Sequence, residues 1–256
     1  MPRVLLLADL HVLSDVGLVD PNYTFNSHDP PRSFKPSLNK TQETIYSEWE
    51  QMIEEVGQVQ QTFVVGDTIE GYNYHGNGIG VQNTSINEQA EMGFGLLDMI
   101  KCSNYAGVQG SGYHSGHNPK NEMEVLRKLS QKYHTKFKFG INSRELVSDR
   151  IFDIRHVQPF RKKRDSRPNA ALEEIKLLVG DPGYEHGSVH FMIRGHCHYW
   201  HPYVRYDGVE YISLPCWKDR DEFIELKSTV KPDLGYVVVD IDNKGRYDIW
   251  EHIFRI

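Results

Sequence analysis

The sequence predicts an α/β fold, in which short buried strands alternate with amphipathic helices. Residues 4–8 and 62–65 are continuous apolar runs, as expected of strands that are covered on both faces. Residues 45–56 carry apolar side chains at helical spacing, which indicates a helix packed against such a sheet. The C-terminal part of the chain is rich in strand-like segments joined by turn signals such as Asp207-Gly208.

Bulk composition limits the kinds of protein this chain can be. It has 256 residues, 39% of them hydrophobic and 25% charged, which suits one globular domain over residues 1–256. Its 29 basic and 35 acidic residues give a net charge of -6, so any contact with nucleic acid must be local. We expect no membrane span, because every apolar run is too short. Three scattered cysteines favour a reducing compartment, so we expect a cytoplasmic protein.

The first strand delivers two polar side chains at its end. Residues 4–8 run into Asp9-Leu10-His11, and in open α/β sheets the carboxyl ends of the strands are where ligands bind. Residues 13–38 are polar and proline-rich, and we predict that they form a surface insert without regular structure. Such an insert either shapes a substrate site or is a plain excursion of the chain. A helix should begin at Asn39, with its apolar stripe facing the core.

The second and third strands repeat the pattern of the first. Residues 62–65 stop at Gly66-Asp67, where the glycine clears space for the carboxylate. A glycine-rich loop and a helix over residues 86–101 lead to a strand at 105–109, which ends in a loop that contains His114. Pro119 suits the first turn of the next helix.

A strand at residues 150–155 delivers His156, and a cluster of basic residues follows it. This cluster consists of Arg161, Lys162, Lys163 and Arg164. A charge run of this kind is either a solvated loop or a basic lip that contacts the phosphates of a substrate. A helix is predicted over residues 170–179.

The last polar strand end carries two histidines. Residues 188–193 form an apolar strand that runs into Gly195, followed by His196 and His198. Histidines two residues apart in an extended segment point to the same side, and neutral imidazoles bind metal ions. A pair of hydrogen-bonded loop histidines is the alternative interpretation of this motif alone.

Taken together, five strand ends carry a set of carboxylates and imidazoles. The set comprises Asp9, His11, Asp67, His114, His156, His196 and His198. Oxygen and nitrogen ligands without thiolates favour divalent ions such as Mn²⁺, Fe²⁺ or Zn²⁺. Because the set exceeds the needs of one tetrahedral site, we predict two metal ions.

At this point the sequence resembles the calcineurin-like metallophosphoesterase family. The matching motifs are Asp9-x-His11, Gly66-Asp67, the glycine loop that ends at His114, the isolated His156, and Gly195-His196-x-His198. They occur in the family's order over residues 9 to 198. Each motif is weak alone, whereas five in order are specific.

The resemblance implies a four-layer α/β/β/α sandwich, with two mixed sheets face to face and helices outside. It implies a dinuclear centre in which Asp67 bridges the two ions. Asp9, His11 and His198 would complete one site, and His156 and His196 would belong to the other. His114 would contact the phosphate and assist the leaving group.

The chain departs from the family in one loop. The family usually has Gly-Asn-His there, with the asparagine as a metal ligand, whereas this chain has Ser111 and Tyr113 before His114. Ser111, a backbone carbonyl or water would replace that ligand, or the second metal would bind weakly. His117 with Asn118 is a less favoured centre for this motif.

The expected reaction is phosphoester hydrolysis by a metal-bound hydroxide, with Mn²⁺ as the preferred ion. A phosphodiesterase or nuclease is suggested by the basic lip and by aromatic residues that could stack on bases. These aromatic residues are Tyr113, Tyr199, Trp200 and Trp217. A phosphomonoesterase or a small-nucleotide phosphodiesterase is equally compatible with the metal centre. The alternative outside the enzymes is a scaffold protein that keeps the fold but has lost catalysis.

Overall fold

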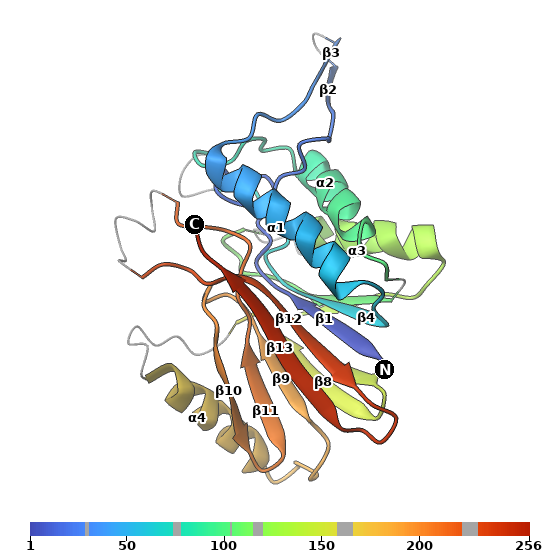
Figure 1. Ribbon diagram of the computed structural model, residues 1–256, viewed down its shortest axis with the longest axis vertical. Coiled ribbons are helices and arrows are strands. Elements are labelled where there is room, and N and C mark those ends of the chain that lie inside the picture. Colours follow the sequence, from blue (N-terminus) through green and yellow to red (C-terminus); the bar gives the residue numbers. More distant parts are fainter. Residues whose placement is uncertain (29–30, 74–77, 103, 115–119, 158–165, 222–229) are drawn as a thin grey trace.

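The computed structural model describes the whole chain except residues 29–30, 74–77, 103, 115–119, 158–165 and 222–229. The described residues form two large mixed sheets, a two-stranded hairpin and four α-helices (Figure 1). Among these helices, none is both long and apolar enough to cross a lipid bilayer.

The first sheet has six strands within the described residues, in the order β13-β12-β1-β4-β5-β6. Their bounds are β1 Arg3–Leu7, β4 Gln61–Val65, β5 Tyr105–Val108, β6 Lys138–Gly140, β12 Leu234–Ile241 and β13 Tyr247–Phe254. Strands β1, β4, β5 and β6 are parallel to one another. Strand β12 is antiparallel to β1, and β13 is antiparallel to β12. The parallel strands therefore send their carboxyl ends to one edge.

The second sheet has five strands in the described part of the chain, in the order β10-β11-β9-β8-β7. Their bounds are β7 Asn142–Val147, β8 Arg150–Arg155, β9 Phe191–Arg194, β10 His201–Tyr206 and β11 Val209–Ser213. Strands β8, β9 and β11 are parallel, and β7 and β10 close the two sides as antiparallel neighbours. Asp207 and Gly208 between β10 and β11 both have positive φ angles, as the predicted two-residue turn requires.

The two sheets pack face to face and helices cover their outer faces (Figure 1). Strand β1 shows this, since Val4 and Leu6 pack between the sheets while Leu5 and Leu7 face the helices. The helices on that side are α1 Lys40–Val56, α2 Ile86–Asp98 and α3 Lys120–Tyr133. Helix α4, Arg167–Val179, packs on the outer face of the second sheet. The α/β/β/α sandwich expected from the sequence is confirmed.

Local signals explain where the helices begin. Asn39 caps α1: its side chain accepts from the Gln42 amide, and the Gln42 side chain accepts from the Asn39 amide. Helix α4 begins at Arg167, three residues earlier than predicted, because Pro168 fits the first helical turn. Helix α2 ends at Asp98, three residues before its predicted end.

Residues 13–38 differ from their predicted form. The segment contains an antiparallel hairpin, β2 Phe25–His28 and β3 Pro31–Phe34, which projects beyond the sandwich (Figure 1). Its first half is buried, because Leu13, Leu18 and Val19 pack into the core below the helices. Only part of the segment is thus a surface excursion.

The carboxyl ends of strands from both sheets meet at one edge of the sandwich. Within the first sheet, the Asp9 amide donates to the Gly66 carbonyl over 3.1 Å. Within the second, the Gly195 amide donates to the His156 carbonyl over 3.1 Å. The two sheets are joined there because the His196 amide donates to Asp9 Oδ2 over 2.9 Å.

Candidate metal centre

The seven predicted carboxylate and imidazole residues lie together at this edge. Asp9, His11, Asp67, His114, His156, His196 and His198 fall into three overlapping groups whose ligand atoms could hold a metal ion. Asp9 and His11 are completely buried, and Asp67 and His156 are 1% exposed. These four side chains are therefore held within the protein, whereas His114 and His198 are half-buried and His196 is exposed.

Five of these residues have the left-handed backbone conformation that side chains rarely adopt. The φ angles are 53° at Asp9, 46° at His11, 47° at Asp67, 73° at His196 and 53° at His198. Each such residue costs on the order of 1–3 kcal/mol, and such residues persist where the surrounding structure determines them. The chain turns sharply after each strand and aims the following side chain into the edge.

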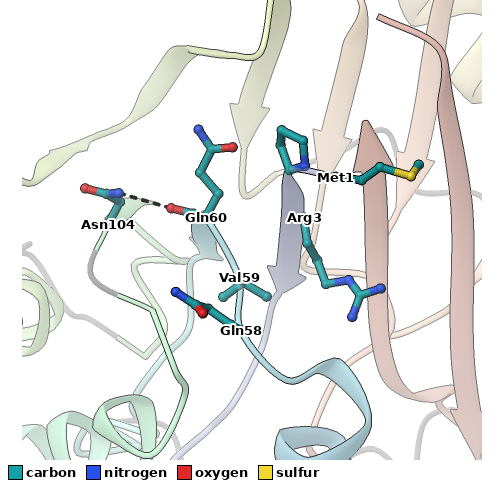
Figure 2. Close-up of a pocket in the computed structure, with 7 residues that line it drawn as sticks. Met1, Arg3, Gln58, Val59, Gln60 and Asn104 are labelled. Atoms are coloured by element: carbon teal, nitrogen blue, oxygen red, sulfur yellow. Dashed lines mark hydrogen bonds between the residues drawn. The ribbon is translucent and has the colours of Figure 1, made fainter. Parts of the chain in front are cut away.

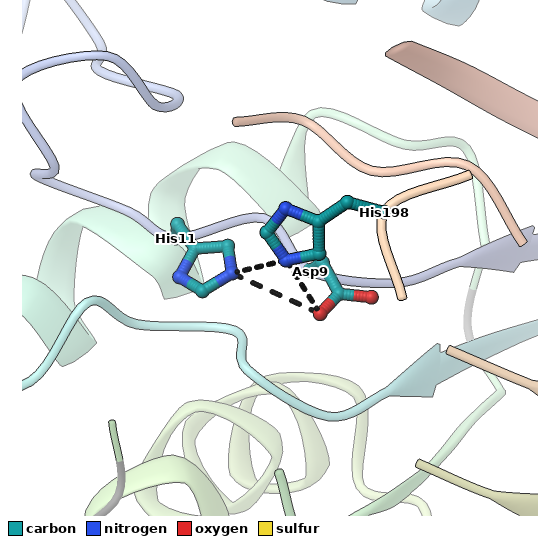
Figure 3. Close-up of side chains that lie close together, drawn as sticks. All are labelled: Asp9, His11 and His198. Atoms are coloured by element: carbon teal, nitrogen blue, oxygen red, sulfur yellow. Dashed lines mark hydrogen bonds and ion pairs between the residues drawn. The ribbon is translucent and has the colours of Figure 1, made fainter. Parts of the chain in front are cut away.

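The first group consists of Asp9, His11 and His198 (Figure 3). Asp9 Oδ1 lies 3.2 Å from His198 Nε2 and 3.8 Å from His11 Nε2. The two Nε2 atoms are 3.1 Å apart. Asp9 Oδ1 is buried and accepts no hydrogen bond from any described residue. An orphaned carboxylate oxygen that faces two imidazole nitrogens fits a divalent cation.

The second group consists of Asp67, His156 and His196. Asp67 Oδ2 lies 3.0 Å from His156 Nε2, and His156 Nε2 lies 3.2 Å from His196 Nδ1. His196 is the most exposed member of the group, whereas Asp67 and His156 are both buried. These donors repeat the chemistry of the first group, one carboxylate with two imidazoles.

The two groups are adjacent and share neighbours. Asp67 also groups with His11 and His114, and the ligand atoms of each group lie within 4.8 Å of one another. Asp9 Oδ1 is 3.9 Å from His156 Nε2, which connects the first group to the second. The arrangement places two sets of candidate ligands side by side, one around Asp9 and one around Asp67.

Hydrogen bonds on the far side of two imidazoles fix their orientation. His156 Nδ1 donates to the Val65 carbonyl over 2.8 Å, so its Nε2 is the nitrogen that faces Asp67. His11 Nδ1 lies 2.9 Å from Glu70 Oε2, which leaves its Nε2 facing Asp9 and His198. Partners of this kind typically orient metal-binding histidines.

The charges of the cluster are strongly coupled. Burial alone would raise the pKa of Asp67, but the His156 and His114 imidazoles hold it well below its usual range. Burial opposes the His156 imidazolium, yet Asp67 and Asp9 raise the pKa of His156 to about 10. Without a metal ion a proton on His156 balances the carboxylates. A bound cation would take over that role.

Two glycines leave no room for a side chain. A Cβ on Gly66 would lie 2.5 Å from His156 Nδ1, and Gly66 has a φ of 73°. A Cβ on Gly110 would lie 2.1 Å from Asp67 Oδ1. Gly66, the glycine predicted to clear space for Asp67, makes room for the His156 ring, whereas Gly110 makes room for the Asp67 carboxylate.

The loop after β5 places Ser111 beside Asp67. The Ser111 amide donates to Asp67 Oδ1 over 2.7 Å, and its hydroxyl lies 3.0 Å from Asp67 Oδ2.

His114 Nδ1 donates to the Glu70 carbonyl over 2.9 Å, and burial lowers the pKa of His114 to about 4. His114 is therefore neutral, with a lone pair on Nε2. His117 and Asn118 lie outside the described residues.

Three buried ionisable residues next to the cluster were not predicted. Glu70 is 1% exposed, and its carboxylate lies 2.9 Å from Lys218 Nζ as well as beside His11. Glu122 accepts from the Thr68 and Gly110 amides, which tethers the loops after β4 and β5. Burial and the nearby Asp67 charge raise the pKa of Glu122 to about 8. Of these three residues, only Glu70 had a signal in the sequence that could have pointed to the site, namely its position three residues after Asp67.

Two of the aromatic residues expected to stack on bases cannot do so. Tyr199 is 3% exposed and Trp217 is completely buried, where it packs edge-on against Trp49. Tyr113 and Trp200 are partly exposed. The predicted basic lip of Arg161, Lys162, Lys163 and Arg164 lies outside the described residues.

A pocket at a different place does not belong to this centre. It has a volume of about 430 Å³ and is lined by Met1, Arg3, Gln60, Asn104 and their neighbours (Figure 2). Asn104 Nδ2 donates to the Gln60 carbonyl across its rim over 3.1 Å. These residues precede or begin β1, β4 and β5, so the pocket lies at the amino ends of strands whose carboxyl ends carry the cluster.

Comparisons with known proteins find similarity in structure but not in sequence. No family model and no curated protein matches the chain. An archaeal phosphodiesterase is 13% identical over 98% of this chain and 99% of that one, with a TM-score of 0.48. Vps29 of Chaetomium thermophilum is 7% identical over 99% and 98%, with a TM-score of 0.48. A dimetal phosphatase from Danio rerio is 10% identical over 93% and 92%, with a TM-score of 0.43.

Because these identities and TM-scores are low, the function must follow from the chain's own site. The structure itself shows two mixed sheets face to face, helices outside them, and an aspartate–histidine cluster at one edge. This is the architecture that the resemblance to calcineurin-like metallophosphoesterases implies.

Proposed function

We propose that the chain is a metal-dependent phosphoester hydrolase with a dinuclear centre, and that its substrate is a phosphodiester. The observation that carries this proposal is the pair of adjacent Asp/His groups, one around Asp9 and one around Asp67. Two divalent ions, when bound, supply a water of lowered pKa and a clamp on the oxygens of an in-line displacement at phosphorus. Mn²⁺ is the ion we expect, with Fe²⁺ or Zn²⁺ as alternatives.

The protein's contribution is to hold the ligands in place. In this proposal Asp67 would contribute to both metal sites, Asp9, His11 and His198 would hold one ion, and His156 and His196 would hold the other. Five of these six residues, all except His156, have the left-handed backbone conformation that aims their side chains into the edge before any ion binds. Burial of Asp9 and Asp67 excludes water, which strengthens their attraction for cations.

His114 has two possible roles in this centre, and its geometry defines a test between them. Its Nδ1 is occupied by the Glu70 carbonyl, so only Nε2 can act on a substrate. A neutral Nε2 can bind a metal ion in place of the family's asparagine. To protonate a leaving group, Nε2 must first gain a proton, which a bound phosphate anion would favour. We propose the leaving-group role.

Hydrolysis of two nitrophenyl esters tests the proposed activity. Protein treated with EDTA should hydrolyse neither ester, and added Mn²⁺ should restore activity on bis-p-nitrophenyl phosphate above that on p-nitrophenyl phosphate. Asp67→Asn is the matched variant, because it keeps the shape of the side chain and removes the charge. A preference for the monoester would make the protein a phosphomonoesterase, and metal binding without activity on either ester would make it a scaffold.

The nucleic-acid form of the proposal depends on the basic lip, which stays a prediction from the sequence. If the substrate is DNA or RNA, changing Arg161, Lys162, Lys163 and Arg164 to Ser should flatten the salt dependence of oligonucleotide binding. Each lost phosphate contact changes the log-log slope by about 0.7 to 0.9. Equal slopes for the wild type and the variant would mean that the four basic residues form a solvated loop and do not contact phosphates.

A further inference from the structure

Arg167, the first residue of α4, is a buried cation with no polar partner among the described residues. Its relative exposure is 5%, and its Nε atom is buried with no hydrogen bond. No hydrogen bond or ion pair joins its guanidinium to any residue that the structure describes. Its contact is with an aromatic face, since Arg167 Cζ lies 3.5 Å from the centroid of the Tyr199 ring.

The other buried lysine and arginine side chains among the described residues are paired. Arg194 Nη2 lies 2.9 Å from Asp153 Oδ1 and 2.7 Å from Glu174 Oε1. Lys218 Nζ lies 2.9 Å from Glu70 Oε1 and 3.0 Å from Asp221 Oδ2. Because burying a charge without a counter-ion is costly, the guanidinium of Arg167, which has no counter-ion among the described residues, suits an anionic ligand.

Arg167 contacts a residue that is adjacent in sequence to a candidate metal ligand. Tyr199 directly follows His198, and consecutive Cα atoms are about 3.8 Å apart. The segment is fixed, because the Ser213 hydroxyl donates to the Tyr199 carbonyl over 3.0 Å and the Asp233 amide donates to the His198 carbonyl over 3.0 Å. The guanidinium is thus held over a rigid ring that is one residue from a proposed metal ligand.

The stacked geometry suits one kind of ligand. A guanidinium that rests its face on an aromatic ring keeps its N–H donors in the plane of the group, where they match two oxygens of a phosphate. Arg167 also begins α4, whose N-terminal end adds positive potential. An oxyanion with several oxygens therefore fits better than a halide or a neutral group.

We propose that Arg167, stacked on Tyr199, binds a second phosphate group of the substrate, beside the phosphoester that is hydrolysed. This inference rests on the proposed function, since the second phosphate is placed relative to the reacting one. It selects substrates that carry at least two phosphates, either linked in an oligonucleotide or in a small polyphosphate ester. A simple nitrophenyl ester does not engage Arg167.

The first test needs no catalysis and no metal. EDTA-treated protein is titrated with pyrophosphate in a calorimeter, as wild type, Arg167→Gln, Arg167→Lys and Arg205→Gln. Arg205 is the matched control, because it is an exposed arginine on β10 whose loss changes the net charge equally. Circular dichroism and thermal melting confirm that each variant is folded.

The expected result is that Arg167→Gln weakens pyrophosphate binding about tenfold or more, which corresponds to ~1.4 kcal/mol. Arg167→Lys should give an intermediate value, and Arg205→Gln should bind as the wild type does. If Arg167→Gln does not fold, the lysine variant carries the test, because it keeps the charge and loses the two-pronged contact. Absence of binding to the wild type, or equal binding by wild type and both Arg167 variants, would overturn the proposal.

The second test identifies the source of the phosphate. With Mn²⁺, Arg167→Gln should raise KM for the favoured multiply phosphorylated substrate and leave kcat/KM for bis-p-nitrophenyl phosphate unchanged. If KM rises only for an oligonucleotide, the second phosphate belongs to a nucleic-acid backbone. If KM rises only for a nucleoside diphosphate ester, the second phosphate belongs to a small substrate. Equal losses on all substrates would make Arg167 a structural residue. An inactive wild type would refute the proposed function while the calorimetric result still stands.

Discussion

Glu70 Oε2 lies 2.9 Å from His11 Nδ1, and the same carboxylate lies 2.9 Å from Lys218 Nζ. The Lys218 ammonium keeps Glu70 ionised, because despite burial it holds the pKa of Glu70 down to about 2. An ionised Glu70 requires a proton on His11 Nδ1, which leaves the lone pair on Nε2 for a metal ion. The buried pair thus sets the tautomer of a proposed ligand.

Glu70→Gln should weaken metal binding while the protein stays folded. The amide keeps the shape of the side chain but no longer favours a proton on His11 Nδ1, so we expect metal affinity to fall about 10- to 100-fold. Competition with a fluorescent chelator measures this. Glu91→Gln, at an exposed carboxylate paired with Lys128, is the control and should change nothing. Unchanged affinity in Glu70→Gln would show that the pair does not orient His11.

Metal binding should release protons. The pKa of His156 is raised from 6.5 to about 10 in the metal-free protein. Its imidazolium therefore stabilises the metal-free fold fully below pH 6.5, and this contribution is lost as pH rises toward 10. A metal ion must displace that proton at neutral pH, so we expect about one proton or more to be released and affinity to rise with pH. Calorimetry in buffers of different ionisation enthalpy counts the protons, and a count of zero would contradict the account.

His114→Ala separates the two roles of that imidazole. If His114 serves the leaving group, metal content should stay at the wild-type level while kcat falls roughly 10²- to 10⁴-fold. Elemental analysis and the diester assay measure the two quantities. Loss of metal in the variant would identify His114 as a ligand, and unchanged kcat would remove it from the reaction.

Gly110→Ala should distort the centre while every proposed ligand and its charge are kept. Its Cβ would lie 2.1 Å from Asp67 Oδ1, so the loop must shift, at a cost of roughly 1–3 kcal/mol. We expect lower thermal stability and lower metal affinity. Gly95→Ala in α2 is the control, because its Cβ meets nothing within 4 Å and should stabilise the helix by roughly 0.5–1 kcal/mol. If the two variants have the same thermal stability and metal affinity, the close approach of Gly110 to Asp67 does not matter for the metal centre.

The sequence predicts the strand-end residues well for a physical reason. Asp9, Asp67, His156 and His196 each follow a buried strand directly or after one small residue, and parallel strands bring their carboxyl ends to one edge. Their polar character right after an apolar run is visible without coordinates. What the sequence does not show is how the backbone turns, with positive φ, to aim these side chains inward.

Burial of charged and aromatic side chains is what sequence patterns leave open. Glu70, Lys218 and Arg167 look like surface residues, and only tertiary contacts show them to be buried. Tyr199 and Trp217 looked available to stack on bases, yet both pack inside the protein. The buried first half of residues 13–38 was missed likewise, because Leu13, Leu18 and Val19 show neither helical nor strand periodicity.

The most direct test of the dinuclear centre is the metal content of the wild-type protein. Purified protein is stripped with EDTA, reconstituted with Mn²⁺, freed of excess ion and subjected to elemental analysis. Because Asp9 and Asp67 each head a group of one carboxylate and two imidazoles, the account predicts about two ions per chain. Clearly less than one ion per chain would contradict it.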